Sequence, residues 1–161
     1  MIQAITETNL IFTVQTEDNR INTAVASSKI RHLVKFTNDM DKSVLYAYPT
    51  AQEIFDRYTK FQFTYNVTNR VYSGDINLIP AGYWKYEVFE VSWIGTVTLL
   101  AGNAPITEND VLTPAADDKG VVQGLVTKGK MYVAEKDGTQ QVQYTQHPEP
   151  AGQTNYIYYG Q

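Results

Sequence analysis

Two histidines are the residues of this chain best suited to nucleophilic catalysis, since the chain contains no cysteine. A serine nucleophile needs a neighbouring base, so His32 and His147 are the options for a relay. His32 falls on the otherwise apolar face of a strand-like segment, and we interpret it as a tucked structural histidine. His147 precedes Pro148 in a polar stretch, and we interpret it as solvated. No Gly-x-Ser-x-Gly or Ser-x-x-Lys motif occurs, so the sequence predicts no catalytic triad.

Paired carboxylates are the next residues that could do chemistry. Glu87 and Glu90 lie three apart in a strand-like segment, which predicts that they point to opposite faces. Glu108, Asp110 and the pair Asp117–Asp118 could ligate Ca²⁺ together with backbone carbonyls. They lack the Asp-x-Asp-x-Asp-Gly run of a specific calcium loop, so solvated loop charge is the favoured interpretation.

Glycine-rich phosphate cradles are missing from the sequence, which has neither a Walker motif nor Gly-x-Gly-x-x-Gly. Gly120, Gly124 and Gly129 lie in or beside strand-like sequence, where bulges or close approaches explain glycine better. We therefore expect no catalytic residue, no metal and no cofactor, and we expect that the protein is not an enzyme.

Composition limits the remaining function classes. Hydrophobic residues make up 43% of 161 residues, enough for the core of one domain. The net charge is −4, and the 13 Lys and Arg are scattered along the sequence, which argues against nucleic-acid binding. No apolar run approaches 18 residues, and the first residues lack the basic and apolar regions of a signal peptide, so neither a membrane span nor secretion is expected.

Alternation of apolar and polar residues predicts strands as the elements that position these side chains. It is clearest in Phe61–Val67, Trp84–Val88 and Ile30–Phe36, while Val44–Tyr48 is apolar throughout. Further strands are expected at Leu10–Gln15, around Ile76–Ile79, and at Thr96–Leu100, Gly124–Ala134, Gln140–Gln146 and Asn155–Tyr159. Short strands at this spacing predict an all-β fold, either an antiparallel β-sandwich or a partly closed barrel with extended termini.

The segments between these strands complete the expected organisation. Asn38–Lys42 is typical of a hairpin loop, and Lys136–Thr139 contains an Asp-Gly turn signal. Thr50–Tyr58 has helical spacing after a threonine cap and predicts one short helix. Ala101–Gly120 is expected to be a long surface loop. The expected division is an N-terminal arm (1–9), a β-sandwich domain (10–146) and a C-terminal arm or added strand (147–161).

Aromatic residues and the acidic loop are the candidates for interactions with partners. Tyrosine and tryptophan suit surfaces that are apolar on one side and wet on the other. An apolar strand at a chain end either closes its own sheet or pairs with another subunit, and both options stay open here. The predicted interface residues are Tyr156, Ile157, Tyr158, Tyr159, Trp93, Asp117 and Asp118, and the candidate stacking platforms are Trp93, Tyr83 and Tyr132.

Four segments in order resemble a known family. They are Leu33–Asp39 (LVKFTND), Arg57–Phe63 (RYTKFQF), Leu78–Glu90 (LIPAGYWKYEVFE) and Gly124–Val133 (GLVTKGKMYV). Their order and spacing resemble small structural proteins of tailed bacteriophages, including crAss-like and marine phages, which form or decorate the virion head. The resemblance covers roughly residues 30 to 135. It implies no enzyme activity and no cofactor, with the major capsid protein or other virion proteins as partners.

The expectation is therefore a bacteriophage virion structural protein, most simply an auxiliary or decoration protein bound to the capsid. It would be made in the host bacterial cytoplasm, be located in the virion, and contact neither nucleic acid nor membrane; a homo-oligomer is possible. The alternative is a carbohydrate- or receptor-binding β-sandwich module of a phage or cell surface. A hydrolase on a jelly-roll-like scaffold is a third option that no residue of the sequence favours.

Overall fold

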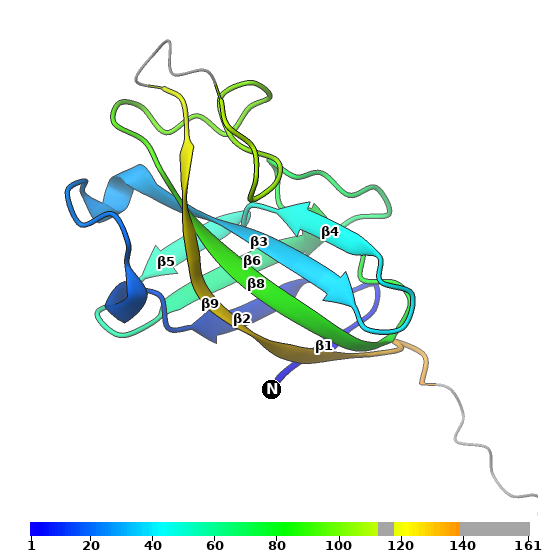
Figure 1. The fold of residues 1–161 in the computed structure, drawn as a ribbon. Coiled ribbons are helices and arrows are strands. Elements are labelled where there is room, and N and C mark those ends of the chain that lie inside the picture. Colours follow the sequence, from blue (N-terminus) through cyan, green and yellow to red (C-terminus); the bar gives the residue numbers. More distant parts are fainter. Residues whose placement is uncertain (113–117, 139–161) are drawn as a thin grey trace, which may run out of the picture.

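Two β-sheets packed face to face make up the protein in the computed structural model, which describes residues 1–112 and 118–138 (Figure 1). The five-stranded sheet has the order β1-β9-β8-β3-β4, and the four-stranded sheet has β2-β6-β5 with β7 paired to β6. The strands are β1 (Ile2–Ile5), β2 (Leu10–Val14), β3 (Ile30–Asn38), β4 (Val44–Ala47), β5 (Ala51–Ile54), β6 (Thr59–Tyr65), β7 (Asp75–Ile76), β8 (Gly82–Ser92) and β9 (Val121–Ala134).

This arrangement confirms the all-β prediction and selects a sandwich over a closed barrel. Most neighbouring strands are antiparallel, but β1 runs parallel to β9 and β7 runs parallel to β6. Within the described ranges, the helical elements are two short 3-10 turns, η1 (Glu17–Asn19) and η2 (Ser27–Lys29).

The main core lies between the sheets and follows from the alternating pattern. Phe61 and Phe63 of β6 are fully buried, and Trp84 and Phe36 face them from the five-stranded sheet. Phe12 stacks on Phe63 at 6.0 Å between ring centroids, and Phe36 meets Phe63 edge-on at 5.5 Å. Aromatic pairs in these geometries add to the stabilisation that burial of apolar area provides.

A second core covers part of the opposite, outer face of the five-stranded sheet. Leu33, Phe89 and Val91 point outward from β3 and β8 and are packed with Tyr48, Trp93 and Ala104. Trp93 and Ala104 belong to the segment 93–112, whose loops gather beyond the end of β8 (Figure 1), and Tyr48 directly follows β4. Half of this sheet is therefore buried on both faces, while the outer face of its other half stays open.

The glycines confirm the prediction of bulges and close approaches. Gly124 has φ of +145° beside a register shift between β8 and β9, a conformation that favours glycine. A Cβ at Gly120 would lie 2.5 Å from the indole ring of Trp93, and one at Gly129 would lie 2.5 Å from the hydroxyl of Tyr86.

Three predictions of local structure were wrong. Thr50–Tyr58 is not a helix: Ala51–Ile54 is β5, and Phe55 N–H donates to Tyr58 O (2.9 Å) in the turn to β6. Thr96–Leu100 forms no strand, because Val97 and Leu99 instead pack as loop residues against the second core.

The third wrong prediction concerns the N-terminal residues. The segment 1–9 was predicted to be an arm, but Ile2–Ile5 is β1 and pairs in register with Met131–Ala134 of β9. Ala4 of β1 is buried in the main core, and this burial holds the N-terminal strand against the sandwich. The expected strands at Gln140–Gln146 and Asn155–Tyr159, and the arm 147–161, lie outside the described residues.

Candidate interaction surface

His32 is a structural residue, as the sequence predicted. Its side chain is 2% exposed, lies 5.3 Å from the ring of Phe61, and places Nδ1 at 3.1 Å from Oε1 of Gln52. Burial lowers the pKa of His32 to about 4, so the ring is neutral near pH 7. A neutral, enclosed imidazole bonded to an amide is an anchor and does not serve as a base for a surface substrate.

The two strand carboxylates lie on opposite faces of β8, which confirms the prediction. Glu90 is 1% exposed on the inner face, where its oxygens accept from the backbone N–H of Ile21 (2.9 Å) and Asn22 (2.8 Å). Glu87 lies on the outer face, 3.8 Å from Nζ of Lys35. Glu90 therefore fixes the segment after η1, and the pair forms no shared acid–base site.

The acidic residues of the long loop hold the loop in place. Glu108 accepts from Nζ of Lys35 at 2.5 Å and from the hydroxyl of Tyr46. Asp110 accepts from the N–H groups of Ile106 (2.7 Å) and Thr107 (3.1 Å) and closes a tight turn. In residues 1–112 and 118–138, no cluster of three His, Asp or Glu is placed to hold a metal ion.

The predicted interface residues have mixed outcomes. Trp93 is only 1% exposed in the second core, so the prediction that its ring is a surface platform was wrong; its burial follows from the loop that covers it. Asp118 accepts from the side-chain amide of Asn103 and ties the two ends of the loop together. Asp117 and the residues Tyr156, Ile157, Tyr158 and Tyr159 lie outside the described residues.

Four lysines meet on the open outer half of the five-stranded sheet. Strand pairing places Lys35, Glu87 and Lys128 in one row across β3, β8 and β9. The next row holds Thr37, Lys85 and Lys130. A groove of about 660 Å³ runs over these rows, and we call it the lysine face; it is lined by Lys35, Thr37, Val44, Lys85, Tyr86, Glu87, Lys128, Gly129 and Lys130.

The lysines of this face differ in how strongly they are engaged. The hydrogen bond to Glu108 raises the pKa of Lys35, which stays charged and bound to the loop. Lys85 is half exposed and lies 3.2 Å from Asp39. Lys128 and Lys130 have no carboxylate within 4.0 Å among the described residues. The β9 side of the face thus offers positive charge to a partner.

Two exposed tyrosines border the lysine face. Tyr83 and Tyr132 are opposite residues of β8 and β9, with 54% and 39% of their surfaces exposed. Their ring centroids are 5.1 Å apart. Both were predicted as stacking platforms, and both have rings accessible to a partner.

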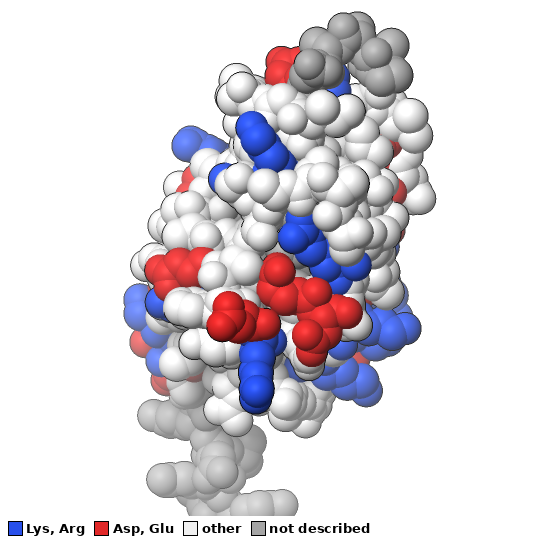
Figure 2. Space-filling view, turned by 90° about the vertical axis from the view of Figure 1, so that its left-hand side faces the viewer, with Lys and Arg blue, Asp and Glu red and all other residues white. Residues whose placement is uncertain are grey.

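The scattered distribution of basic residues in the sequence hid this clustering. Lys35, Lys85, Lys128 and Lys130 come from three strands, and only the strand order brings them together. The local signal was Lys128-x-Lys130, two lysines on one face of a strand. A different side of the molecule, where η1 and β5 lie, shows acidic and basic side chains mixed with one another (Figure 2).

Comparisons with known proteins leave the surface to be interpreted from its own geometry. No protein-family model, curated protein or solved structure matches the chain. Over the part of the chain that the structure covers, no helix has the length and apolarity needed to cross a bilayer.

Proposed function

We propose that the protein is a structural component of a bacteriophage virion, an auxiliary protein that binds the capsid through the lysine face. Support comes first from the resemblance of four ordered segments to small phage structural proteins. Three of them, Leu33–Asp39, Leu78–Glu90 and Gly124–Val133, largely make up β3, β8 and β9. The same three strands supply the lysines.

The lysine face is the observation on which this proposal rests. A grooved sheet surface with several cations and two exposed tyrosines suits a protein partner whose opposing surface is acidic. Lys85 and Lys130 are directly opposite each other on β8 and β9, so one carboxylate of a partner can contact both. Capsid symmetry repeats such a contact many times, and modest contacts then suffice for attachment.

Charge reversal on this face tests the proposal. The double variant Lys85→Glu/Lys130→Glu inverts the charge of the lysine face, and we expect it to lose binding to purified capsid shells in sedimentation. The control is Arg57→Glu/Lys60→Glu, which makes the same change of net charge in the β5–β6 hairpin of the other sheet. We expect the control to bind like the wild type, with attachment weakened by salt.

Two outcomes would contradict the proposal. One is unchanged shell binding by the lysine-face variant while its thermal unfolding matches that of the wild type. The other is equal loss of binding in both double variants, which would make net charge the cause. Tight, salt-dependent binding of the wild type to duplex DNA instead of shells would overturn the expectation of a protein partner.

Carbohydrate binding is the second candidate, and the exposed pair Tyr83 and Tyr132 favours it. Adjacent tyrosine rings can stack on the apolar face of a sugar. The test is glycan binding by the wild type and by Tyr83→Ala/Tyr132→Ala. Saturable binding that this variant abolishes, while shell binding persists, would favour the carbohydrate-binding function over assembly.

A further inference from the structure

An open corner of the sandwich lies where β3 extends beyond its neighbour. β4 pairs with Val34–Thr37 only, so within residues 1–112 and 118–138 no strand pairs with the earlier part of β3 on that side. The side chain of Gln52 on β5 takes the place of a strand there: Oε1 accepts from the N–H of His32 (3.2 Å), and Nε2 donates to the carbonyl of Ile30 (3.4 Å). This link joins the two sheets at the corner.

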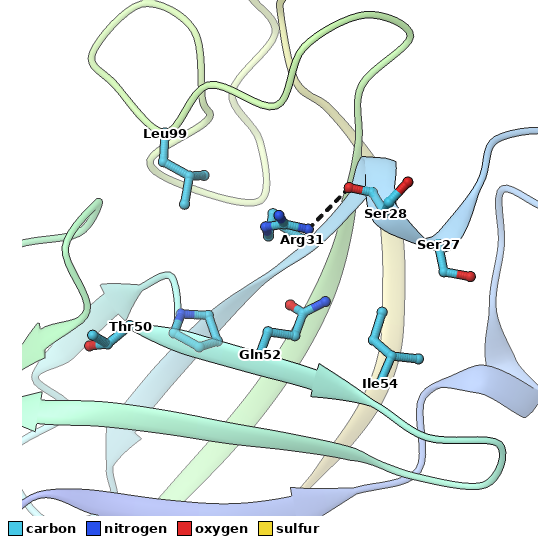
Figure 3. A pocket seen from close by; sticks show the side chains of 8 residues that line it. Ser27, Ser28, Arg31, Thr50, Gln52, Ile54 and Leu99 are labelled. Atoms are coloured by element: carbon cyan, nitrogen blue, oxygen red, sulfur yellow. Dashed lines mark hydrogen bonds between the residues drawn. The ribbon is translucent and has the colours of Figure 1, made fainter.

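A pocket of about 420 Å³ opens at this corner, and Arg31 lies inside it between Leu99 and Gln52 (Figure 3). Its polar lining includes hydroxyl groups, and its walls are partly apolar. The lining residues are Ser27, Ser28, Arg31, Pro49, Thr50, Gln52, Ile54 and Leu99.

The guanidinium of Arg31 is held in place but lacks an anionic partner. Nη1 donates to the carbonyls of Ser28 (3.3 Å) and Ile30 (2.8 Å), which orients the planar group. No carboxylate lies within 4.0 Å of it in the described part of the chain. The nearby carboxylate of β5, Glu53, is bonded to Lys60 at 3.3 Å. A half-buried cation that a protein positions without a counter-ion is suited to a ligand that brings one.

The shape of the surroundings favours a peptide as that ligand. β5 ends the order of the four-stranded sheet, so one side of its main chain has no strand partner among the described residues. Gln52 and Ile54 on β5, and Thr50 just before it, are alternate residues that line the pocket. No aromatic ring lines the pocket, which disfavours a stacked sugar.

We propose that this corner binds an extended acidic peptide segment of a partner protein, which lies along β5 and places a carboxylate on Arg31. The planar guanidinium matches a carboxylate through paired N–H groups, and an edge strand supplies main-chain bonds that fix an extended peptide. The proposal depends on this corner alone and holds whether or not the lysine face binds a capsid.

Titration with matched peptides tests the proposal. The probes are a blocked pentapeptide with a central glutamate between two valines, the same peptide with central glutamine, and free glucuronate. The readouts are calorimetry and the shifts of the Arg31 Nε–H and β5 amide signals in NMR. Wild-type protein is expected to bind the glutamate peptide about tenfold more tightly than the glutamine peptide, as a charge-assisted hydrogen bond provides.

Variants assign this preference to Arg31. In Arg31→Gln the two peptides are expected to bind equally, whereas Arg57→Gln, an exposed arginine in the β5–β6 turn, is expected to keep the wild-type preference. Equal binding of both peptides to the wild type, no measurable binding of either, or a preference that survives in Arg31→Gln would each overturn the proposal. Tighter binding of glucuronate than of the glutamate peptide would overturn the choice of a peptide ligand.

Discussion

Glu90 shows how one buried side chain determines the path of a distant segment. It is nearly inaccessible to solvent, and its two oxygens accept hydrogen bonds from the backbone N–H groups of Ile21 and Asn22. A buried polar group that loses its hydrogen-bond partners destabilises the folded state, so both bonds matter. The segment between η1 and η2 therefore depends on a residue almost seventy positions away.

Replacing Glu90 with glutamine is expected to destabilise the fold by about 2 kcal/mol. The amide has one acceptor oxygen, so one of the two backbone N–H groups loses its hydrogen bond. Amides of Ile21 and Asn22 should exchange faster with solvent, as measured by hydrogen exchange in NMR. The control is Glu87→Gln on the outer face of the same strand, expected to change stability by less than about 1 kcal/mol. Equal effects of the two variants would contradict this role for Glu90.

His32 is expected to make stability depend on pH in mildly acidic solution. Burial lowers its pKa to about 4 in the folded state, whereas the unfolded chain titrates near the ordinary value. Since the unfolded state binds the proton more readily, the free energy of unfolding should fall by about 1.5 kcal/mol from pH 6.5 to 5.

Urea unfolding at a series of pH values measures this dependence. The variant His32→Gln removes the titrating group, so its stability should be nearly constant between pH 5 and 6.5. Three carboxylates have a pKa lowered from the ordinary value, Asp41, Glu108 and Asp110, so in the folded state they titrate below this window. If the free energy of unfolding of His32→Gln depended on pH as strongly as that of the wild type, another group would be responsible.

At the scale of elements, the segment 93–112 works as a cover for the second core. The hydroxyl of Tyr48 donates to the carbonyl of Pro105 at 2.8 Å, and Glu108 binds Lys35 and Tyr46 on the sheet. The loop is therefore fixed by one buried hydrogen bond, from Tyr48, and by partly exposed hydrogen bonds between Glu108 and the sheet.

The variant Tyr48→Phe tests the cover. Loss of the buried bond is expected to cost about 1 kcal/mol, and exchange should accelerate at amides of the loop such as Ala104. The control Tyr83→Phe removes an exposed hydroxyl from β8 and should leave both quantities unchanged. Faster exchange throughout the sheets, without a local effect on the loop, would contradict the cover.

The strands with strict alternation could be predicted because every second side chain of a strand faces the core, and in these segments every second residue is apolar. Phe61, Phe63 and Trp84 show this agreement. The structure of Thr50–Tyr58 could not be predicted, because the spacing of its apolar residues fits a hairpin as well as a helix. In the hairpin, the rings of Phe55 and Tyr58 stack at 4.7 Å across the turn. Pairing with β6 outweighs a helical preference in so short a segment.

The candidate surfaces were harder to predict because they depend on strand order. Lys35 and Lys128 are brought onto one face by β8, which lies between their strands. The role of Gln52 depends on where β4 stops along β3, a boundary that local sequence does not specify. The burial of Trp93 depends on the loop that closes over it.

At the scale of the whole molecule, the two faces of one sheet are used unequally. The inner face builds the main core, and the outer face is half covered by loops and half open as the lysine face. A sandwich needs only its inner faces for stability, so the open half is available for a partner.

Electron microscopy of the phage particle to which we assign this protein tests the central proposal most directly. The account predicts copies of this sandwich on the shell in numbers comparable to the capsid subunit, with Lys85, Lys128 and Lys130 against an acidic surface of that subunit. Particles that lack the protein, or copies whose lysine face points to solvent, would contradict it.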